Sequence, residues 1–135
     1  MSTEFYWSFK NACEIVESPS AEALRLLEVG SKNITIPGLV MGIVHDANEK
    51  DVFMMHTSDM NTLYNETRFY SFEDEAGGYV RIKQRMLRDN EWYDRNVGSC
   101  SNVAQVIDKI GEEIERFAKL SNVQMPDFGN KAQPA

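Results

Sequence analysis

The sequence predicts an α+β fold, in which a mainly antiparallel sheet of about six strands packs against an N-terminal helix and a longer C-terminal amphipathic helix. Three observations indicate this class. Short extended segments, separated by polar turns, fill the middle of the chain. A capped helix precedes most of these segments, and the strongest helical periodicity of the chain follows them. The 135 residues are enough to bury a core as one domain.

The first two predicted elements are a strand and a helix. Residues Glu4–Lys10 place aromatic side chains at every second position, which is typical of a strand with one buried face. Ser18 can cap the helix that follows, and a proline suits the first turn because its missing amide would have no partner there. We predict this helix over Pro19–Val29 and expect it to end at Gly30.

A hydrophobic strand is predicted next, over Asn33–His45. Its apolar residues fall on both faces, which indicates a place in the middle of the sheet, covered on both sides. Pro37-Gly38 must interrupt the strand as a bulge or bend, because proline cannot donate to the ladder. The polar segment Asp46–Asp51 predicts a turn, and Val52–Thr57 returns as the neighbouring strand.

A hairpin is predicted over residues 63–88, with Leu63–Phe72 in its first strand. Alternate positions in both strands are apolar, so one face of the hairpin belongs to the core. The other face carries three cations at a spacing of two residues: Arg81, Lys83 and Arg85. We expect acidic cross-strand partners for them, Glu73 or Glu91. The alternative is that the three cations bind phosphate or an acidic partner.

The chain is predicted to finish with a strand and a long helix. A polar turn at residues 87–91, whose Asp-Asn pair suits positive φ, leads into a strand over Glu91–Val97. The helix Val103–Leu120 has the clearest apolar stripe of the chain. Asn102 with Gln105 resembles a capping box at its start. We expect residues 1–120 to form a single domain and residues 121–135 to form a flexible tail.

Three consecutive acids, Glu73, Asp74 and Glu75, are expected where this hairpin reverses, just before two glycines. A calcium loop needs oxygen ligands at alternating positions and a distal bidentate glutamate, and that spacing is absent. An exposed turn also gives no carboxyl the raised pKa that acid catalysis requires. Two interpretations are left: a solvated loop, or a recognition loop for a basic partner.

Aromatic residues on the last strands are candidates for a binding surface. Tyr79, Trp92 and Tyr93 lie on strands whose two faces cannot all be buried. Exposed tyrosine and tryptophan beside charges are typical of interface hot spots, and packing beneath the helices is the alternative. The predicted partner-binding set therefore joins the acids to these aromatic residues: Glu73, Asp74, Glu75, Tyr79, Trp92 and Tyr93.

No catalytic residue, metal site or cofactor is predicted. His45 and His56 could meet across a hairpin, but no cysteine or acid stands at ligand spacing from them. Cys13 and Cys100 are expected to be free buried thiols, because no export signal is visible and a domain of this size needs no disulfide.

The net charge of −7 constrains the class of partner. An acidic protein has no basic field with which to bind nucleic acid or anionic membranes, so neither is expected as a partner. A basic protein partner is compatible with this charge. No apolar stretch is long enough to cross a bilayer, and no secretory signal is visible, so we expect a cytoplasmic protein.

The order of strand, helix, antiparallel meander and C-terminal helix resembles small bacterial immunity proteins of polymorphic-toxin and contact-dependent inhibition systems. The similarity is strongest where FYWSF (Phe5–Phe9) precedes SPSAEALRLL (Ser18–Leu27) and GLVMGIV (Gly38–Val44). It is a resemblance of architecture without a diagnostic motif. It implies a stoichiometric inhibitor without catalysis or cofactor, whose acidic patch docks on a basic toxin.

Two functional hypotheses follow. The first is a non-catalytic binding protein that neutralises a cognate protein such as a toxin nuclease; a phage-borne inhibitor of a host defence complex would have the same sequence features. The second is a small enzyme or ligand-binding domain with a pocket between sheet and helix, lined by His45, His56, Tyr64 or Cys100. A homodimer joined at a sheet edge is compatible with both.

Overall fold

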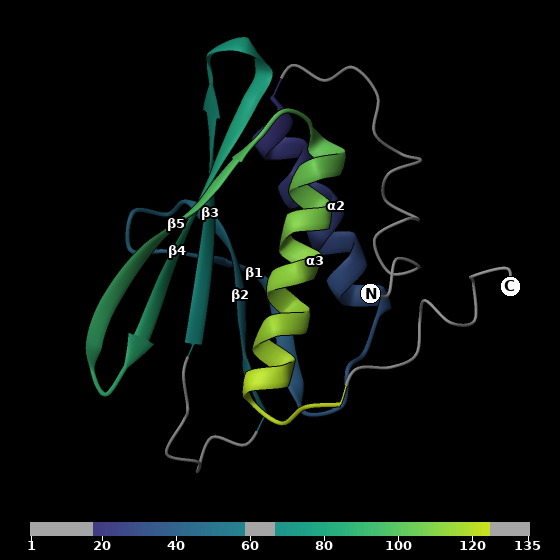
Figure 1. Ribbon diagram of the computed structural model, residues 1–135, viewed down its shortest axis with the longest axis vertical. Coiled ribbons are helices and arrows are strands. Elements are labelled where there is room, and N and C mark those ends of the chain that lie inside the picture. Colours follow the sequence, from purple (N-terminus) through teal and green to yellow (C-terminus); the bar gives the residue numbers. More distant parts are fainter. Residues whose placement is uncertain (1–17, 59–66, 125–135) are drawn as a thin grey trace, which may run out of the picture.

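The computed structural model describes residues 18–58 and 67–124. These residues form an antiparallel five-stranded sheet with two helices, which confirms the predicted α+β class (Figure 1). The elements in chain order are α2 (Pro19–Asn33), β1 (Leu39–His45), β2 (Asp51–Thr57), β3 (Thr67–Glu75), the short 3-10 turn η1 (Ala76–Gly78), β4 (Tyr79–Arg88), β5 (Glu91–Cys100) and α3 (Val103–Leu120). The described part has five strands rather than about six. The strand predicted over Glu4–Lys10 lies outside it.

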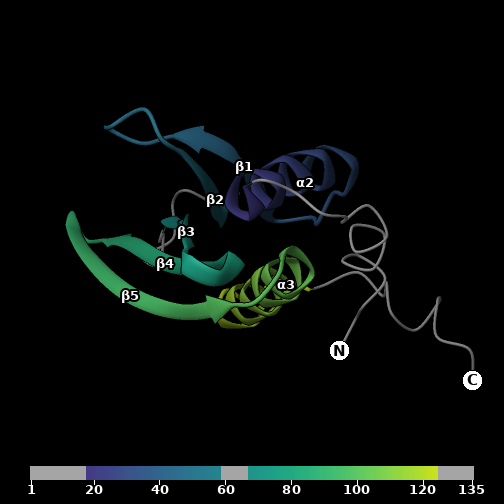
Figure 2. The same cartoon turned by 90° about the horizontal axis from the view of Figure 1, so that it is seen from above.

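The strands follow one another in the sheet as they do in the sequence, in the order β1-β2-β3-β4-β5. Both helices lie on the same side of this sheet (Figure 2). Helix α2 contacts mainly β1, β2 and β3, and α3 contacts β4, β5 and α2. No helix in residues 18–58 and 67–124 is long and apolar enough to span a membrane.

Helix α2 begins as predicted and continues past its predicted end. Ser18 is the N-cap, and its hydroxyl oxygen accepts the backbone N–H of Ala21 at 3.3 Å. The prediction that the helix ends at Gly30 is wrong, since the helix continues to Asn33. Gly30 is buried on the face that packs against the core, and its carbonyl accepts the N–H of Ile34 at 3.0 Å. Tertiary packing thus outweighs the cost of about 1 kcal/mol that glycine carries inside a helix.

Strand β1 is shorter than predicted and lies at the edge of the sheet formed by the described residues. The predicted start of this strand at Asn33 is wrong, and among the described residues the strand is not central. Gly38 has a φ of +89° in a turn after Pro37, so regular pairing starts only at Leu39. One face of β1 packs beside α2. The other face is also apolar, but it carries the exposed Val40 and points away from both helices.

The other turns form as their sequences predict. The carboxylate of Asp46 accepts the backbone N–H groups of Asn48 at 2.8 Å and Lys50 at 3.0 Å between β1 and β2. Asp89 and Asn90 have φ values of +51° and +65° between β4 and β5, as is required for a tight two-residue hairpin turn. Local turn chemistry therefore sets the register of both hairpins.

The three acids are not in a turn, which corrects the prediction for this segment. Strand β3 continues to Glu75, and the reversal is made by Ala76–Gly78. Two consecutive glycines with φ near +80° allow this short turn, so β3 can pair to its last residue. The acids alternate between the two faces of the sheet instead of fanning out from a loop.

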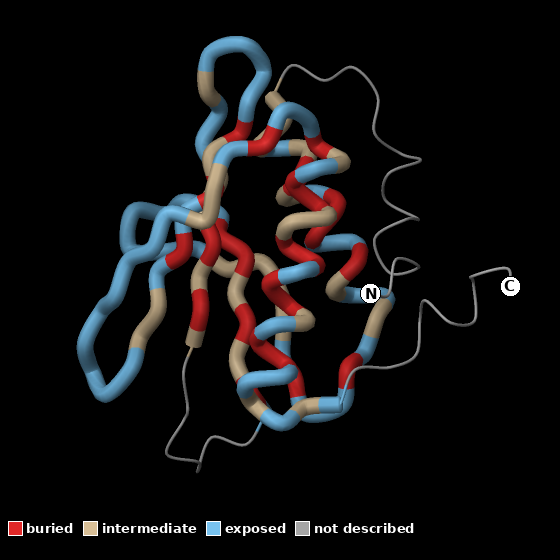
Figure 3. Tube along the Cα trace, in the orientation of Figure 1, coloured by how far each residue is buried: buried red, intermediate tan, exposed pale blue. Residues whose placement is uncertain are grey.

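The core lies between the two helices and the sheet (Figure 3). The apolar stripe predicted for α3 is buried, from Val103 to Phe117, and it faces large buried residues of the strands such as Phe53 and Tyr70. Fully burying one such side chain stabilises a protein by about 1.5–3 kcal/mol. The N-cap of α3 is also as predicted, because Asn102 Oδ1 accepts the N–H of Gln105 at 2.9 Å.

Candidate functional site

One face of the sheet is covered by no element of the described chain. We call it the open face, and it is the side of the sheet opposite α2 and α3 (Figure 2). The strand pairing and the alternation along β2 to β5 place every second side chain on it. Its members alternate with core residues along each strand: Val52, Met54, Phe69, Ser71, Glu73, Glu75, Arg81, Lys83, Arg85, Trp92, Asp94, Asn96 and Ser99. The strand ladder therefore collects both charged and aromatic candidates on one surface.

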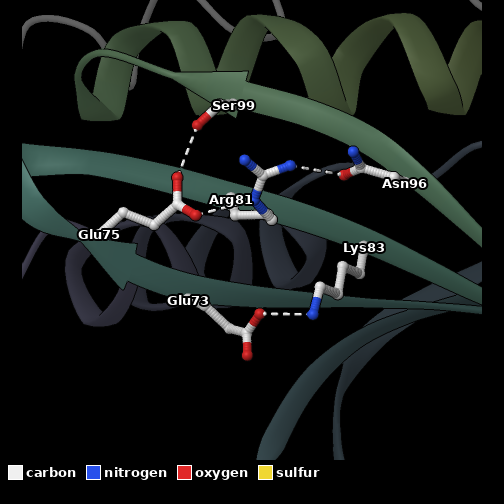
Figure 4. Close-up of polar contacts among 6 residues, drawn as sticks. All are labelled: Glu73, Glu75, Arg81, Lys83, Asn96 and Ser99. Carbon is white, nitrogen blue, oxygen red and sulfur yellow. Dashed lines mark hydrogen bonds and ion pairs between the residues drawn. The ribbon is translucent and has the colours of Figure 1, made fainter.

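Glu75 is at the end of the open face nearest the β3–β4 turn and is held by two neighbours (Figure 4). Its carboxylate accepts Arg81 Nε–H at 2.8 Å and the hydroxyl of Ser99 at 2.9 Å. Both hydrogen bonds lower the pKa of Glu75, and the bond from Arg81 has the larger effect. The hydrogen bond between Arg81 and Glu75 also raises the pKa of Arg81. A second guanidinium nitrogen of Arg81 donates to Asn96 Oδ1 at 3.2 Å. The arginine therefore bridges β3 to β5.

An irregularity in β5 makes this bridge possible. The register between β4 and β5 shifts between Ile82 and Lys83, so Arg81 faces Ser99 while Lys83 faces Asn96. Without the extra residue, positions 96 and 99 would lie on opposite faces of the sheet. The bulge places both polar side chains on the open face.

Two more ion pairs continue the ladder along β4. Lys83 Nζ lies 3.0 Å from Glu73 Oε1, and Arg85 Nε lies 3.0 Å from Asp94 Oδ1. The predicted cross-strand partner Glu73 is thus confirmed. Exposed pairs of this kind contribute little to stability, about 0–1 kcal/mol each. Their consequence is electrostatic, because the acids of the open face are matched by cations and do not form an acidic patch.

Asp74 has a different role from its two neighbours, because it points toward the N-terminus of α2. Its carboxylate accepts the hydroxyls of Ser18 at 2.7 Å and Ser20 at 2.8 Å, and the backbone N–H of Ser20 at 2.9 Å. Burial raises the pKa of Asp74, but the hydrogen bonds from Ser18 and Ser20 outweigh it, and the net pKa is lowered. The negative charge also lies at the positive end of the helix dipole. Asp74 therefore ties α2 to β3.

Replacing Asp74 by alanine is expected to lower the free energy of unfolding by about 1–2 kcal/mol, the usual cost of losing a helix cap. Because the folded-state pKa is lowered, this stabilisation is complete above the ordinary aspartate pKa of about 4 and disappears as the pH falls through the folded-state value. Urea unfolding of both proteins at neutral and acid pH measures the difference. Glu73→Ala is the matched control, for which a loss of less than about 0.5 kcal/mol is expected. An equal loss in the two variants would show that Asp74 does not cap α2.

A groove of about 330 Å³ lies at the other end of the open face. It opens where β1–β2 and β4–β5 separate, because β2 pairs with β3 through only three residues. Its lining joins the β1–β2 turn to the sheet: His45, Asp46, Ala47, Asn48, Val52, Phe69, Ser71, Arg85 and Trp92. The floor is apolar and the rim is polar, a composition typical of binding sites.

Trp92 is the central exposed residue of this groove. It is 49% exposed, and its ring centroid lies 5.8 Å from that of Phe69. The guanidinium of Arg85 lies 5.0 Å from the centre of the Trp92 ring, in position for a cation–π contact. At the rim, His45 Nδ1 lies 2.8 Å from Asp51 Oδ1. Contacts to Phe69 and Arg85 hold the indole in place while nearly half of its surface stays accessible.

The structure distributes the six predicted binding residues over four places, because Asp74 and Tyr93 lie far apart on the helix side of the sheet. On the open face, Glu73, Glu75 and Tyr79 lie near the β3–β4 turn, and Trp92 lies about 26 Å from Tyr79 along β4, given the rise per strand residue. Tyr93 is 46% exposed but points to the helix side of the sheet, as Asp74 does. The predicted set is therefore not one contiguous surface, and its role in binding stays a prediction.

Of the nine residues that line the groove, only Trp92 is in the predicted set, and the residues missed include Phe69, Arg85 and Val52. The sequence did contain a signal for the first of them. Phe69 has the same parity as Arg81 and Lys83, so an aromatic side chain interrupts an otherwise polar face. The burial of Val52 had no such signal, because it depends on residues distant in the sequence that line the same groove.

The second functional hypothesis predicts a pocket between sheet and helix, but the described residues that were predicted to line it do not lie together. His45 lies on the rim of the open-face groove, and His56 faces Val40 five residues further back along the hairpin. Cys100 is a free thiol buried in the core, and burial raises its pKa. Tyr64 lies outside the described residues. Among the residues described, no group of three or more His, Cys, Asp or Glu side chains could hold a metal ion.

A buried polar cluster that the sequence analysis missed lies between the sheet and α3. Glu113 is 4% exposed, and its Oε1 accepts Tyr70 Oη–H at 2.9 Å and an N–H of Arg95. Arg95 Nε also donates to Gln84 Oε1 at 2.6 Å. Burial, and then the charge of Glu113, raise the pKa of Tyr70. Glu113 lies within the apolar stripe of α3, three residues after Ile110, and this position is the signal that could have revealed it.

Comparisons with known proteins add no further information. No family model matches this chain, and neither a curated protein nor a solved structure is significantly similar to it. The resemblance to immunity proteins therefore stays a prediction. Function has to be inferred from the geometry and chemistry of the described residues.

Proposed function

We propose that this chain is a non-catalytic binding protein that neutralises a cognate protein partner through the open face of its sheet, with Trp92 at the centre of the contact. The observation that carries the proposal is the groove itself. A half-exposed tryptophan is held between Phe69 and an arginine on a face that no described element covers. Tryptophan and arginine are enriched among the residues that dominate protein–protein binding energy.

The shape and chemistry of the groove fit an apolar side chain projecting from a partner. Its volume of about 330 Å³ is at the lower end of the range for ligand sites, and its floor is made by Val52, Phe69 and Trp92. The polar rim supplies hydrogen-bonding groups from the β1–β2 turn. A buried centre surrounded by a polar rim is the usual organisation of a specific interface.

Charge favours a basic partner at long range. The chain has a net charge of −7, so its overall field attracts a basic protein and speeds the first encounter. At short range, the open face presents alternating positive and negative charges, because its acids are paired with cations. Such a pattern helps to orient a bound partner and adds little net attraction. A toxin such as a basic nuclease fits these requirements, as the immunity-type interpretation implies. A component of a host defence complex would fit them equally well.

Site-specific photocrosslinking in the cells that produce the protein tests this proposal. A photoreactive phenylalanine analogue is placed at Trp92 in one variant and at Tyr93 in a second. The two positions are adjacent and similarly exposed but point to opposite faces, so they form a matched pair. We expect position 92 to capture one defined protein and position 93 to capture much less of it. Equal capture at both positions, or none at position 92, would contradict docking on the open face.

A further inference from the structure

A second hollow, of about 180 Å³, lies on the helix side of the sheet. Strand β5 meets α3 where the chain passes from one to the other, and the two elements diverge toward the β4–β5 hairpin (Figure 1). Between them, residues from three elements converge: Arg68 from β3, Arg95 from β5, and Arg116 from α3. The lining is completed by five further residues: Gln84, Met86, Tyr93, Asp94 and Leu120.

Two of the three arginines are held in place by their neighbours. Arg68 is only 7% exposed, and its guanidinium lies 4.8 Å from the centre of the Phe117 ring. Arg95 is oriented by its hydrogen bonds to Gln84 and Glu113. Since buried and bonded side chains have already lost most of their rotamer freedom, a ligand would meet two donors that are largely preorganised, Arg68 and Arg95.

The charge of this hollow is opposite to that of the chain. Its lining has three positive side chains and one negative one, in a protein whose net charge is −7. The negative residue is Asp94, whose carboxylate lies 3.0 Å from Arg85 on the open face of the sheet. Glu113 neutralises part of this charge through its ion pair with Arg95, but an excess of positive charge is left in the lining, and this excess favours an anion.

We propose that this pocket binds a phosphate group, either free or as a small ester. Guanidinium groups have planar forks of N–H donors that match phosphate oxygens two at a time. The remaining walls, from Tyr93, Met86 and Leu120, are largely apolar and would accept a small organic substituent. Such a site is on the opposite side of the sheet from the proposed partner surface and is independent of it.

The test is calorimetric titration of the full-length protein with inorganic phosphate and with phenyl phosphate, at constant ionic strength. Arg116→Gln is the main variant, because Arg116 takes no part in the Glu113 cluster. We expect it to weaken binding by about 10-fold, as for the loss of one charge-assisted contact. Lys119→Gln is the matched control, since it removes the same charge from the same helix without lining the pocket. It should bind as the unaltered protein does.

Several outcomes distinguish the alternatives. Tighter binding of phenyl phosphate than of inorganic phosphate would support an ester as the ligand, and equal binding would support free phosphate. Absence of saturable binding by either probe would overturn the proposal. Equal weakening by Arg116→Gln and Lys119→Gln would also overturn it, because that result would indicate diffuse attraction. Trp92→Ala should leave phosphate binding unchanged, which separates this site from the open-face groove.

Discussion

Replacing Glu113 by alanine is expected to lower the free energy of unfolding by about 3 kcal/mol, the largest loss we anticipate from a single polar substitution. The carboxylate is 4% exposed and accepts hydrogen bonds from both Tyr70 and Arg95. Its removal leaves the buried hydroxyl of Tyr70 without this acceptor and Arg95 without its counter-charge. It also leaves a space beside the core face of α3.

Urea unfolding followed by circular dichroism measures this loss, with Glu112→Ala as the matched control. Glu112 is the neighbouring residue on α3 and is exposed. It forms a surface ion pair, in which Glu112 Oε1 lies 3.7 Å from Lys109 Nζ. A change within about 0.5 kcal/mol is expected for it. Tyr70→Phe should lie between the two, at about 1 kcal/mol, because it removes one hydrogen bond and leaves the Arg95 pair intact. Similar losses for Glu113→Ala and Glu112→Ala would show that the buried cluster does not stabilise the fold.

Trp92→Ala is expected to weaken binding of the partner captured by crosslinking by about 30-fold or more, equivalent to about 2 kcal/mol. The indole is the largest apolar group exposed in the groove, and its truncation also removes the ring on which Arg85 lies. Since the side chain is 49% exposed, the stability of the free protein should change little. Surface plasmon resonance with the purified partner measures the affinity, and thermal unfolding checks the fold.

Tyr93→Ala is the control for this experiment. It removes a similarly exposed aromatic side chain from the next residue, on the opposite face of the sheet. Affinity should then change by less than about threefold. If Tyr93→Ala weakened binding as much as Trp92→Ala, the partner would contact the helix side of the sheet, and the open face would not be the docking surface.

Removing Glu73, Asp74 and Glu75 together would not isolate the contribution of these acids to partner binding. Asp74 binds Ser18 and Ser20 at the start of α2, so its loss would disturb the fold as well as any contact with a partner. A double substitution of Glu73 and Glu75 would leave this cap in place. Slower association that is less dependent on salt would then support a contribution of these two acids to steering.

Much of the fold could be predicted because its signals are local. The apolar stripe of α3, the alternation in β3 and β4, and the turns before β2 and β5 all depend on residues within a few positions of one another. The errors arose where distant contacts outweighed local preference. Helix α2 continues through Gly30 because its buried face packs on the core, and β1 lies at the edge of the sheet that the described residues form, although its composition suggests a central strand.

The candidate surfaces depended far more on tertiary structure. The fold class, the two helices and the alternating faces of the hairpin could be predicted from the chain alone, because they follow from the periodicity of one strand or helix, whereas the exposure of Trp92 was left open until its place in the sheet was known. Only the tertiary structure decided that Asp74 caps α2, that a bulge brings Asn96 and Ser99 to one face, and that Arg68, Arg95 and Arg116 converge. Those juxtapositions join residues far apart in the chain, and they depend on sheet twist and register, which no short segment encodes.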